Sequence, residues 1–127
     1  MRDDGGTVFG AYCSEAWRKT LHFYGLGESF VFNFDVDGII HAYQYSGANE
    51  KIQFSDERCI ILGGGSSRYG LSNICDFRSQ QSNAALYIAS EFTGGRSGES
   101  ETFENPVLSS QVDFKIRDLE VWGFDSI

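Results

Sequence analysis

The stretch that most constrains the fold is residues 30–45, where side chains alternate in character along two consecutive segments. Phenylalanine occupies every second position of 30–34, and a period of two is typical of a β-strand, whose successive side chains point to opposite faces. Asp37-Gly38 follows, a dipeptide that favours a tight hairpin turn because glycine accepts a positive φ. Residues 39–45 alternate again. The pattern predicts an antiparallel hairpin, whose apolar surface we expect to comprise Phe30, Phe32, Phe34, Ile39, Tyr43 and Tyr45.

Other segments extend this β-rich prediction. Residues 7–13 are expected to form a short strand, and Ser14 is a suitable N-cap for a helical turn over 15–18. The apolar run Cys59–Leu62 ends at a triple glycine, as a buried strand does when it leaves a sheet through a loop. A second apolar run spans 84–88. Together these segments favour a mostly antiparallel sandwich with one or two short helices.

The C-terminal third combines a loop with a final strand. Residues 94–102 are rich in glycine and serine and are expected to form a surface loop. Val112, Phe114 and Ile116 share one alternating phase. The phase then slips near Arg117-Asp118, so a bulge or break is expected there.

Length and charge limit the function classes. A chain of 127 residues is expected to form one domain. Ten Lys and Arg against 18 Asp and Glu give a net charge of −8, which repels nucleic acid and anionic lipid and favours a basic protein partner. No apolar run approaches the roughly 20 residues of a membrane-spanning helix. The acidic, glycine-rich N-terminus has neither a secretory nor a transit pattern, so a cytoplasmic location is expected.

No residue pattern indicates catalysis or a cofactor. The glycine run at 63–65 lacks the spacing of a dinucleotide-binding loop, because position 68 is Arg68, and the phosphate-binding motif G-x-x-x-x-G-K-[ST] occurs nowhere in the sequence. Neither His22 nor His41 is placed near a nucleophile by sequence, and His41 is expected to be a packed, hydrogen-bonded side chain. An acidic run in a Gly/Ser-rich loop is usually a solvated face; this run comprises Glu99, Glu101 and Glu104. The interpretation is a protein that is not an enzyme and holds no cofactor or metal.

The three cysteines are expected to be reduced. Cys13, Cys59 and Cys75 are an odd number at wide spacings, with no CxxC pair. Cys59 lies in an apolar run and is expected to be a small core residue. Cys13 directly precedes the expected helical turn, which would favour a modest lowering of its pKa.

Ordered motifs along nearly the whole chain resemble the TLDc domain of the oxidation resistance proteins. Each motif is short, and their joint order is specific. They are Val8-Phe9-Gly10-Ala11-Tyr12, Ser14 with Trp17, Tyr24-Gly25, Gly27-Glu28-Ser29-Phe30 with Phe32, Leu62-Gly63-Gly64-Gly65, Leu86-Tyr87-Ile88 with Glu91 and Phe92, Gly95-Arg96-Ser97, Glu101-Thr102-Phe103, Asn105-Pro106 with Leu108-Ser109-Ser110, and Leu119-Glu120-Val121-Trp122-Gly123-Phe124.

The resemblance implies a fold and a domain organisation. It implies a mainly β fold with small helices (α+β), in the form of an antiparallel β-sandwich of the TLDc type. Because the family's domain starts upstream of the segment equivalent to Val8, residues 1–127 are expected to be a TLDc domain that lacks its N-terminal part. An atypical insertion is expected at about 71–83.

The resemblance also implies a function. It implies a non-catalytic protein-interaction domain in oxidative-stress resistance, with subunits of the vacuolar proton ATPase as candidate partners. Mitochondria and the cytosolic face of acidic organelles are then alternative locations. Two further functions stay open: a hydrolase or redox enzyme that uses the acidic and glycine loops, and a non-functional truncated product. Ser100 stands where many relatives carry Cys, and Ala89 where they carry an acid, so no redox or metal role is implied at either position. The candidate interaction or motif residues are Glu28, Gly63, Gly64, Gly65, Glu91, Ser97, Glu101, Thr102, Glu120 and Trp122.

Overall fold

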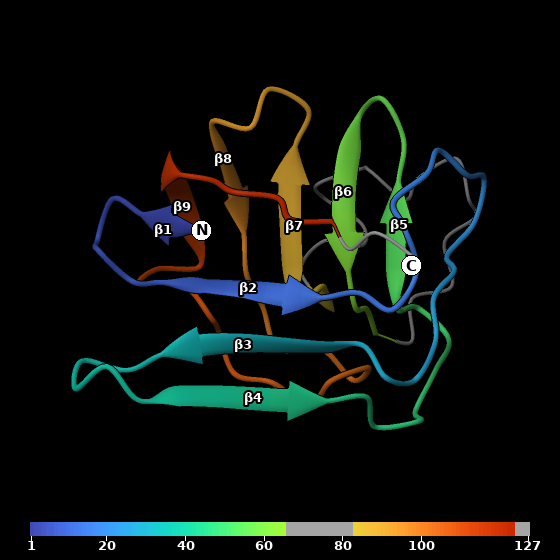
Figure 1. Ribbon diagram of the computed structural model, residues 1–127, viewed down its shortest axis with the longest axis horizontal. Helices are drawn as coiled ribbons and strands as arrows, with labels where there is room; N and C mark the ends of the chain where they lie inside the picture. Colours follow the sequence, from blue (N-terminus) through green and yellow to red (C-terminus); the bar gives the residue numbers. More distant parts are fainter. Residues whose placement is uncertain (66–82, 124–127) are drawn as a thin grey trace.

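Two antiparallel sheets make up the domain in the computed structural model, which describes residues 1–65 and 83–123 (Figure 1). The larger sheet has six strands in the order β1-β9-β8-β7-β6-β5, and the smaller has three in the order β2-β3-β4. The strands are β1 Arg2–Asp3, β2 Phe9–Tyr12, β3 Phe30–Phe34, β4 Ile40–Gln44, β5 Gln53–Ser55, β6 Cys59–Leu62, β7 Leu86–Ala89, β8 Gly94–Arg96 and β9 Asp113–Asp118. The predicted antiparallel sandwich is confirmed.

The hydrophobic core lies between the two sheets, whose strands run across one another in Figure 1. Phe9 of β2 and Phe114 of β9 pack edge to face, with ring centroids 5.0 Å apart, an arrangement that aromatic pairs prefer. The buried members of the core are Phe9, Val31, Ile52, Leu62, Ala85, Leu86, Ile88, Phe103, Leu108 and Phe114. Side chains from both sheets therefore fill one interior.

The two apolar rows of the β3–β4 hairpin lie on opposite faces of the small sheet. Val31 pairs with Tyr43, whereas Phe32 pairs with Ala42, and directly paired residues share a face. Val31 is fully buried. The phenylalanines of β3 lie on the outer face, where neighbouring rings are 6.2 and 6.4 Å apart. The expectation of one continuous apolar surface was wrong, because the turn sets a register that pairs the tyrosine row with Val31.

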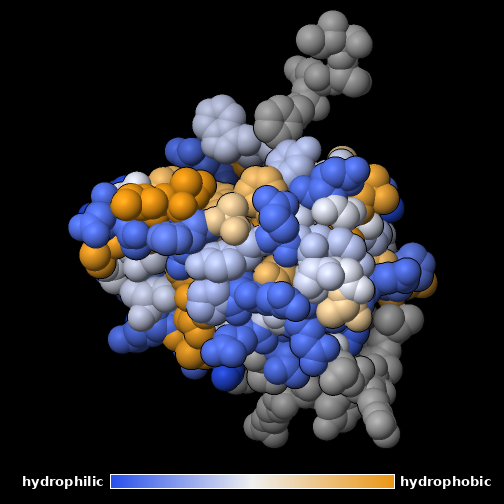
Figure 2. Space-filling model, turned by 90° about the horizontal axis from the view of Figure 1, so that it is seen from below, coloured by the Kyte–Doolittle hydropathy of each residue, from blue (hydrophilic) through white to orange (hydrophobic). Residues whose placement is uncertain are grey.

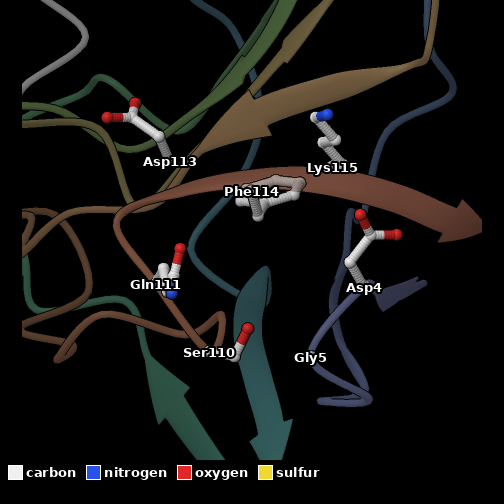
Figure 3. A pocket seen from close by; sticks show the side chains of 7 residues that line it. All are labelled: Asp4, Gly5, Ser110, Gln111, Asp113, Phe114 and Lys115. Atoms are coloured by element: carbon white, nitrogen blue, oxygen red, sulfur yellow. The ribbon is translucent and has the colours of Figure 1, made fainter.

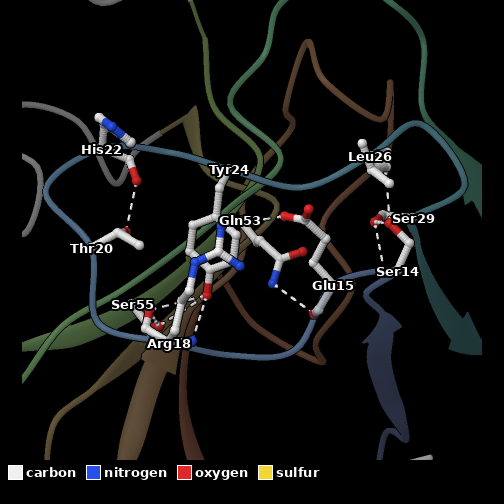
Figure 4. Close-up of polar contacts among 10 residues, drawn as sticks. All are labelled: Ser14, Glu15, Arg18, Thr20, His22, Tyr24, Leu26, Ser29, Gln53 and Ser55. Carbon is white, nitrogen blue, oxygen red and sulfur yellow. Dashed lines mark hydrogen bonds and ion pairs between the residues drawn. The ribbon is translucent and has the colours of Figure 1, made fainter. Parts of the chain in front are cut away.

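Residues 14–29 follow an irregular path in place of the expected helical turn (Figure 4). The Ser14 hydroxyl is within hydrogen-bonding distance of the Ser29 hydroxyl at 3.2 Å, so it does not cap a helix. The Arg18 guanidinium stacks over the Tyr24 ring at 4.1 Å, and the Tyr24 hydroxyl donates to the Arg18 carbonyl. These contacts hold the segment without helical hydrogen bonds, and the described residues contain no α-helix.

The glycine- and serine-rich stretch 94–102 is another departure. Its first three residues form strand β8, and Ser97, Ser100 and Thr102 are buried. The prediction of a surface loop was wrong because buried hydroxyl groups here find hydrogen-bond partners within the protein, as described below. The break after β9 agrees with the expected slip near Arg117-Asp118, since the strand ends at Asp118. The insertion expected at about 71–83 lies, apart from Asn83, outside the described residues.

Candidate functional site

Three loops meet at one end of the sandwich and bring several candidate residues together. We call residues 46–51, 63–65 and 97–105 the glycine-loop cluster. Strand β6 ends at Leu62, and Gly63 turns the chain with a φ of +79°, a conformation that favours glycine. A Cβ at Gly63 would lie 3.0 Å from Ser100 Oγ. The close approach explains why the β6 strand leads into glycine here.

Thr102 joins the loops through its hydroxyl group. This fully buried residue donates a hydrogen bond to Asn49 Oδ1 at 2.6 Å and accepts one from the Gly64 N–H at 3.0 Å. The Asn49 side-chain amide in turn donates to the Gly64 carbonyl at 3.3 Å, and Lys51 Nζ donates to the Gly65 carbonyl at 2.6 Å. The glycine loop is thus closed by polar side chains of the protein itself.

A second set of hydrogen bonds shapes residues 97–105. Ser100 Oγ donates to Asn105 Oδ1 at 2.5 Å, and the Asn105 amide donates to the Gly98 carbonyl at 2.9 Å. Ser97 Oγ donates to the Ala85 carbonyl at 2.7 Å and accepts from the Leu108 N–H at 2.8 Å. Because a buried polar group without a partner is costly, these bonds fix the loop. Their role is structural.

The carboxylates of the cluster point the other way, toward solvent. Glu99, Glu101 and Glu104 are all exposed. The backbone of Glu101 is held from both sides, since its N–H donates to the Gly64 carbonyl at 3.1 Å and its carbonyl accepts from Ser46 Oγ at 2.6 Å. Among the described residues, no ion pair includes any of the three. The cluster therefore presents three exposed carboxylates, without ion-pair partners in the described part of the chain, beside a backbone held by hydrogen bonds.

The remaining candidate residues lie on other elements. Glu28 is exposed just before β3, and Glu91 is exposed in the turn between β7 and β8. Trp122 is 78% exposed, and its indole N–H donates to Glu120 at 3.1 Å. The structure brings Gly63–Gly65, Glu101 and Thr102 together and places Ser97 nearby. Glu28, Glu91, Glu120 and Trp122 lie outside the cluster. Asn49 and Lys51 join the cluster without having been predicted, because no periodicity or motif marks them.

The surroundings of His41, Cys13 and Cys59 differ in part from those expected from the sequence. His41 is hydrogen-bonded as expected, to Asp35 at 2.9 Å, but its side chain is half-exposed where a packed one was expected. That bond is the main reason why the pKa of Asp35 is lowered. Burial raises the pKa of the Cys13 thiol to about 12, and the helix that would favour a lowering is not formed after it. Cys59 is disulfide-bonded, which corrects the expectation of a reduced thiol there.

A pocket of about 430 Å³ lies between the β1–β2 loop and the start of β9 (Figure 3). Its lining residues are Asp4, Gly5, Ser110, Gln111, Asp113, Phe114 and Lys115. The Ser110 hydroxyl donates to the buried Asp3 carboxylate at 2.7 Å, and the Ser110 N–H donates to it at 2.8 Å. Burial alone would raise the pKa of Asp3, but the hydrogen bonds from Ser110 and Thr7 outweigh it and lower the pKa. Asp3 thus anchors the pocket wall through its hydrogen bonds with Ser110.

The described part of the chain contains no group of three or more His, Cys, Asp or Glu side chains arranged to hold a metal ion. Within the same residues, no helix is both long and apolar enough to span a membrane.

Comparison with known proteins decides the family. The family model of the TLDc domain matches residues 1–125. The chain belongs to the TLDc domain family. Nuclear receptor coactivator 7 of Homo sapiens is 32% identical to it over 125 residues, covering 98% of this chain and 12% of that protein. Oxidation resistance protein 1 of Rattus norvegicus is also 32% identical over 125 residues, covering 98% of this chain and 13% of the relative. This TLDc domain therefore spans about one eighth of the length of these curated relatives.

Proposed function

We propose that this TLDc domain is a non-catalytic protein-binding module that acts in oxidative-stress resistance. The observation that supports the proposal is that the glycine-loop cluster has two kinds of polar group: buried groups that bond within the protein and carboxylates exposed to solvent. The glycine loop and the Thr102 hydroxyl, two of the candidate features in the sequence, form hydrogen bonds within the protein. What remains accessible is the charge of Glu99, Glu101 and Glu104. Fixed, exposed carboxylates are suited to recognising a basic protein surface.

The similarity to oxidation resistance protein 1 supports the cellular side of the proposal. The resemblance to TLDc domains further suggests cytosolic subunits of the vacuolar proton ATPase as partners. The net charge of −8 agrees with a basic partner and argues against nucleic acid. We place the domain in the cytoplasm, at the face of organelles where such subunits are accessible.

The test compares binding and turnover on the same protein. The 127-residue chain should capture vacuolar ATPase subunits, and changing Glu99, Glu101 and Glu104 together to Gln should reduce the captured fraction at least several-fold. A matched control changes three exposed carboxylates elsewhere, Asp4, Asp113 and Asp118, to Asn; it alters the net charge equally and should bind like the wild type.

Peroxidase and esterase assays on the purified chain distinguish the non-catalytic binding module from the alternative of a hydrolase or redox enzyme. We expect no turnover above the buffer rate. Turnover that the triple Gln variant abolishes would overturn the proposal in favour of an enzyme. Failure of the wild-type chain both to capture a subunit and to protect peroxide-sensitive cells would favour a non-functional product.

A further inference from the structure

The outer edge of strand β4 differs from the other sheet edges of the molecule. The β5 edge is covered, because Gln53 exchanges backbone hydrogen bonds of 2.8 and 2.9 Å with Tyr24. The β1 edge is only two residues long. The β2 edge is paired at its first residue, where the Phe9 N–H donates to the Met1 carbonyl at 2.9 Å. Within the described residues, β4 alone is a five-residue edge strand without such cover.

The backbone groups of this edge can be assigned from the hydrogen-bond alternation. The Asp35 N–H donates to the Ile39 carbonyl, so Ile39 faces β3, and every second residue after it does the same in an antiparallel ladder. The N–H and C=O groups of Ile40, Ala42 and Gln44 therefore point away from the sheet. All three residues are exposed. They form an open row of donors and acceptors.

Features that normally protect an edge strand are missing from β4. Natural proteins block open edges with lysine, proline or a β-bulge. Strand β4 has the sequence Ile-His-Ala-Tyr-Gln, and its register with β3 is continuous from Ile40 to Gln44. The side chain of Ile40 is also 52% exposed. Viewed from below, a group of hydrophobic residues is exposed at the left end of the molecule, where Figure 1 places the β3–β4 turn (Figure 2).

The formal charges nearest to β4 along the chain have one sign. Residues 20–50 contain no Lys or Arg, and their formal charges come from Glu28, Asp35, Asp37 and Glu50. Asp37 lies in the turn before β4, Glu50 follows the strand, and both are exposed. No ion pair of the described residues includes either one. Along the chain, an exposed carboxylate without an ion-pair partner among the described residues therefore precedes the strand, and another follows it.

We propose that the β4 edge is a strand-addition site for an extended partner segment that alternates apolar and basic residues. Main-chain hydrogen bonds to Ile40, Ala42 and Gln44 would provide affinity. Apolar side chains of the segment would cover Ile40, and basic side chains would reach Asp37 and Glu50. A second copy of this chain fits less well, because each copy carries a net charge of −8. This surface is distinct from the carboxylates of the proposed function.

The test uses a labelled ten-residue peptide of alternating valine and lysine and the wild-type 127-residue chain, with fluorescence anisotropy as the readout. We expect saturable binding. A peptide of the same sequence with N-methylated valines keeps every charge but removes alternate backbone donors, and it should bind at least tenfold more weakly. Equal binding of both peptides would overturn the proposal, as would failure of the first peptide to bind.

Two protein variants locate the site. Ala42→Pro removes an outward N–H while leaving the bonds to β3 in place, and proline is tolerated at such positions; with unchanged circular dichroism it should weaken peptide binding at least tenfold. Asp37→Lys should weaken binding several-fold more than Glu91→Lys, which makes the same change in charge at the β7–β8 turn. If Asp37→Lys and Glu91→Lys have equal effects, attraction is non-specific and the proposal fails. It also fails if light scattering shows a wild-type dimer that Ala42→Pro makes monomeric, since the occupant is then a second copy.

Discussion

The glycine-loop cluster and the β3–β4 hairpin each contain a glycine with a positive φ, but the space around the two glycines differs. Gly63 in the cluster has a φ of +79° and Gly38 in the hairpin has a φ of +78°. A Cβ at Gly63 would lie 3.0 Å from Ser100 Oγ and 3.1 Å from the Phe103 ring, whereas a Cβ at Gly38 would meet nothing within 4 Å. A positive φ and a lack of space for a Cβ are therefore two separate reasons for a glycine. Both apply at Gly63, and only the positive φ applies at Gly38.

The largest expected effect is the difference between alanine substitutions at these two glycines. Gly38→Ala should cost about 1–2 kcal/mol because a residue with a Cβ is strained at positive φ. Gly63→Ala should cost this amount plus about 1–3 kcal/mol for crowding against Ser100 and Phe103. Urea unfolding of the two variants measures both values. Equal losses would show that the packing around Gly63 relaxes freely.

A smaller loss is expected when the buried hydroxyl group of the cluster is removed. Thr102→Val keeps the side-chain shape but leaves Asn49 Oδ1 and the Gly64 N–H without their partner, at a cost of about 2 kcal/mol. Thr102→Ser keeps the hydroxyl group and should recover much of that loss. Thermal unfolding should therefore rank wild type, Ser and Val in that order; a Val variant as stable as the wild type would mean that solvent or a rearranged loop satisfies both groups.

The two regions also differ in how far the sequence could predict them. Alternation at 30–34 and the Asp37-Gly38 turn identified the hairpin, because a strand's period and a turn's φ are local properties. Alternation alone does not say which face is buried, so the phenylalanine and tyrosine rows were grouped wrongly. The cluster depends on contacts between residues far apart in sequence, such as Thr102 with Asn49, and no local rule reports these. Motif resemblance located Gly63–Gly65 and Thr102 but could not distinguish a structural role from a binding one.

Lowering the pH should destabilise the protein through Asp3, which lies in strand β1 of the larger sheet. Its folded-state pKa is lowered, so its stabilising contribution is fully present above the unfolded pKa of about 4 and is lost as the pH falls through the folded pKa. Asp3→Asn weakens the acceptor of the Ser110 and Thr7 bonds and should cost about 1 kcal/mol at neutral pH. The difference between variant and wild type should shrink below pH 4. A pH-independent difference would assign the effect to packing.

The smallest effect is expected at the exposed tip of the hairpin. Val36 is fully exposed, with a relative exposure of 102%, so Val36→Ser should change the free energy of unfolding by less than about 0.5 kcal/mol. Urea unfolding of Val36→Ser and Thr102→Val side by side compares the two losses in the free energy of unfolding. A loss as large as that of Thr102→Val would mean that the hairpin tip packs against another part of the protein in solution.

The central claim is that the buried groups of the glycine-loop cluster build a scaffold and that its exposed carboxylates bind a protein partner. The most direct measurement compares two variants, Thr102→Val and the triple Gln variant of Glu99, Glu101 and Glu104. For each variant, the unfolding temperature and the binding of vacuolar ATPase subunits are determined, and binding is measured well below both unfolding transitions. The account predicts that Thr102→Val lowers the unfolding temperature and keeps wild-type affinity, while the triple variant keeps the unfolding temperature and loses affinity. Loss of binding in folded Thr102→Val, together with full binding by the triple variant, would contradict it.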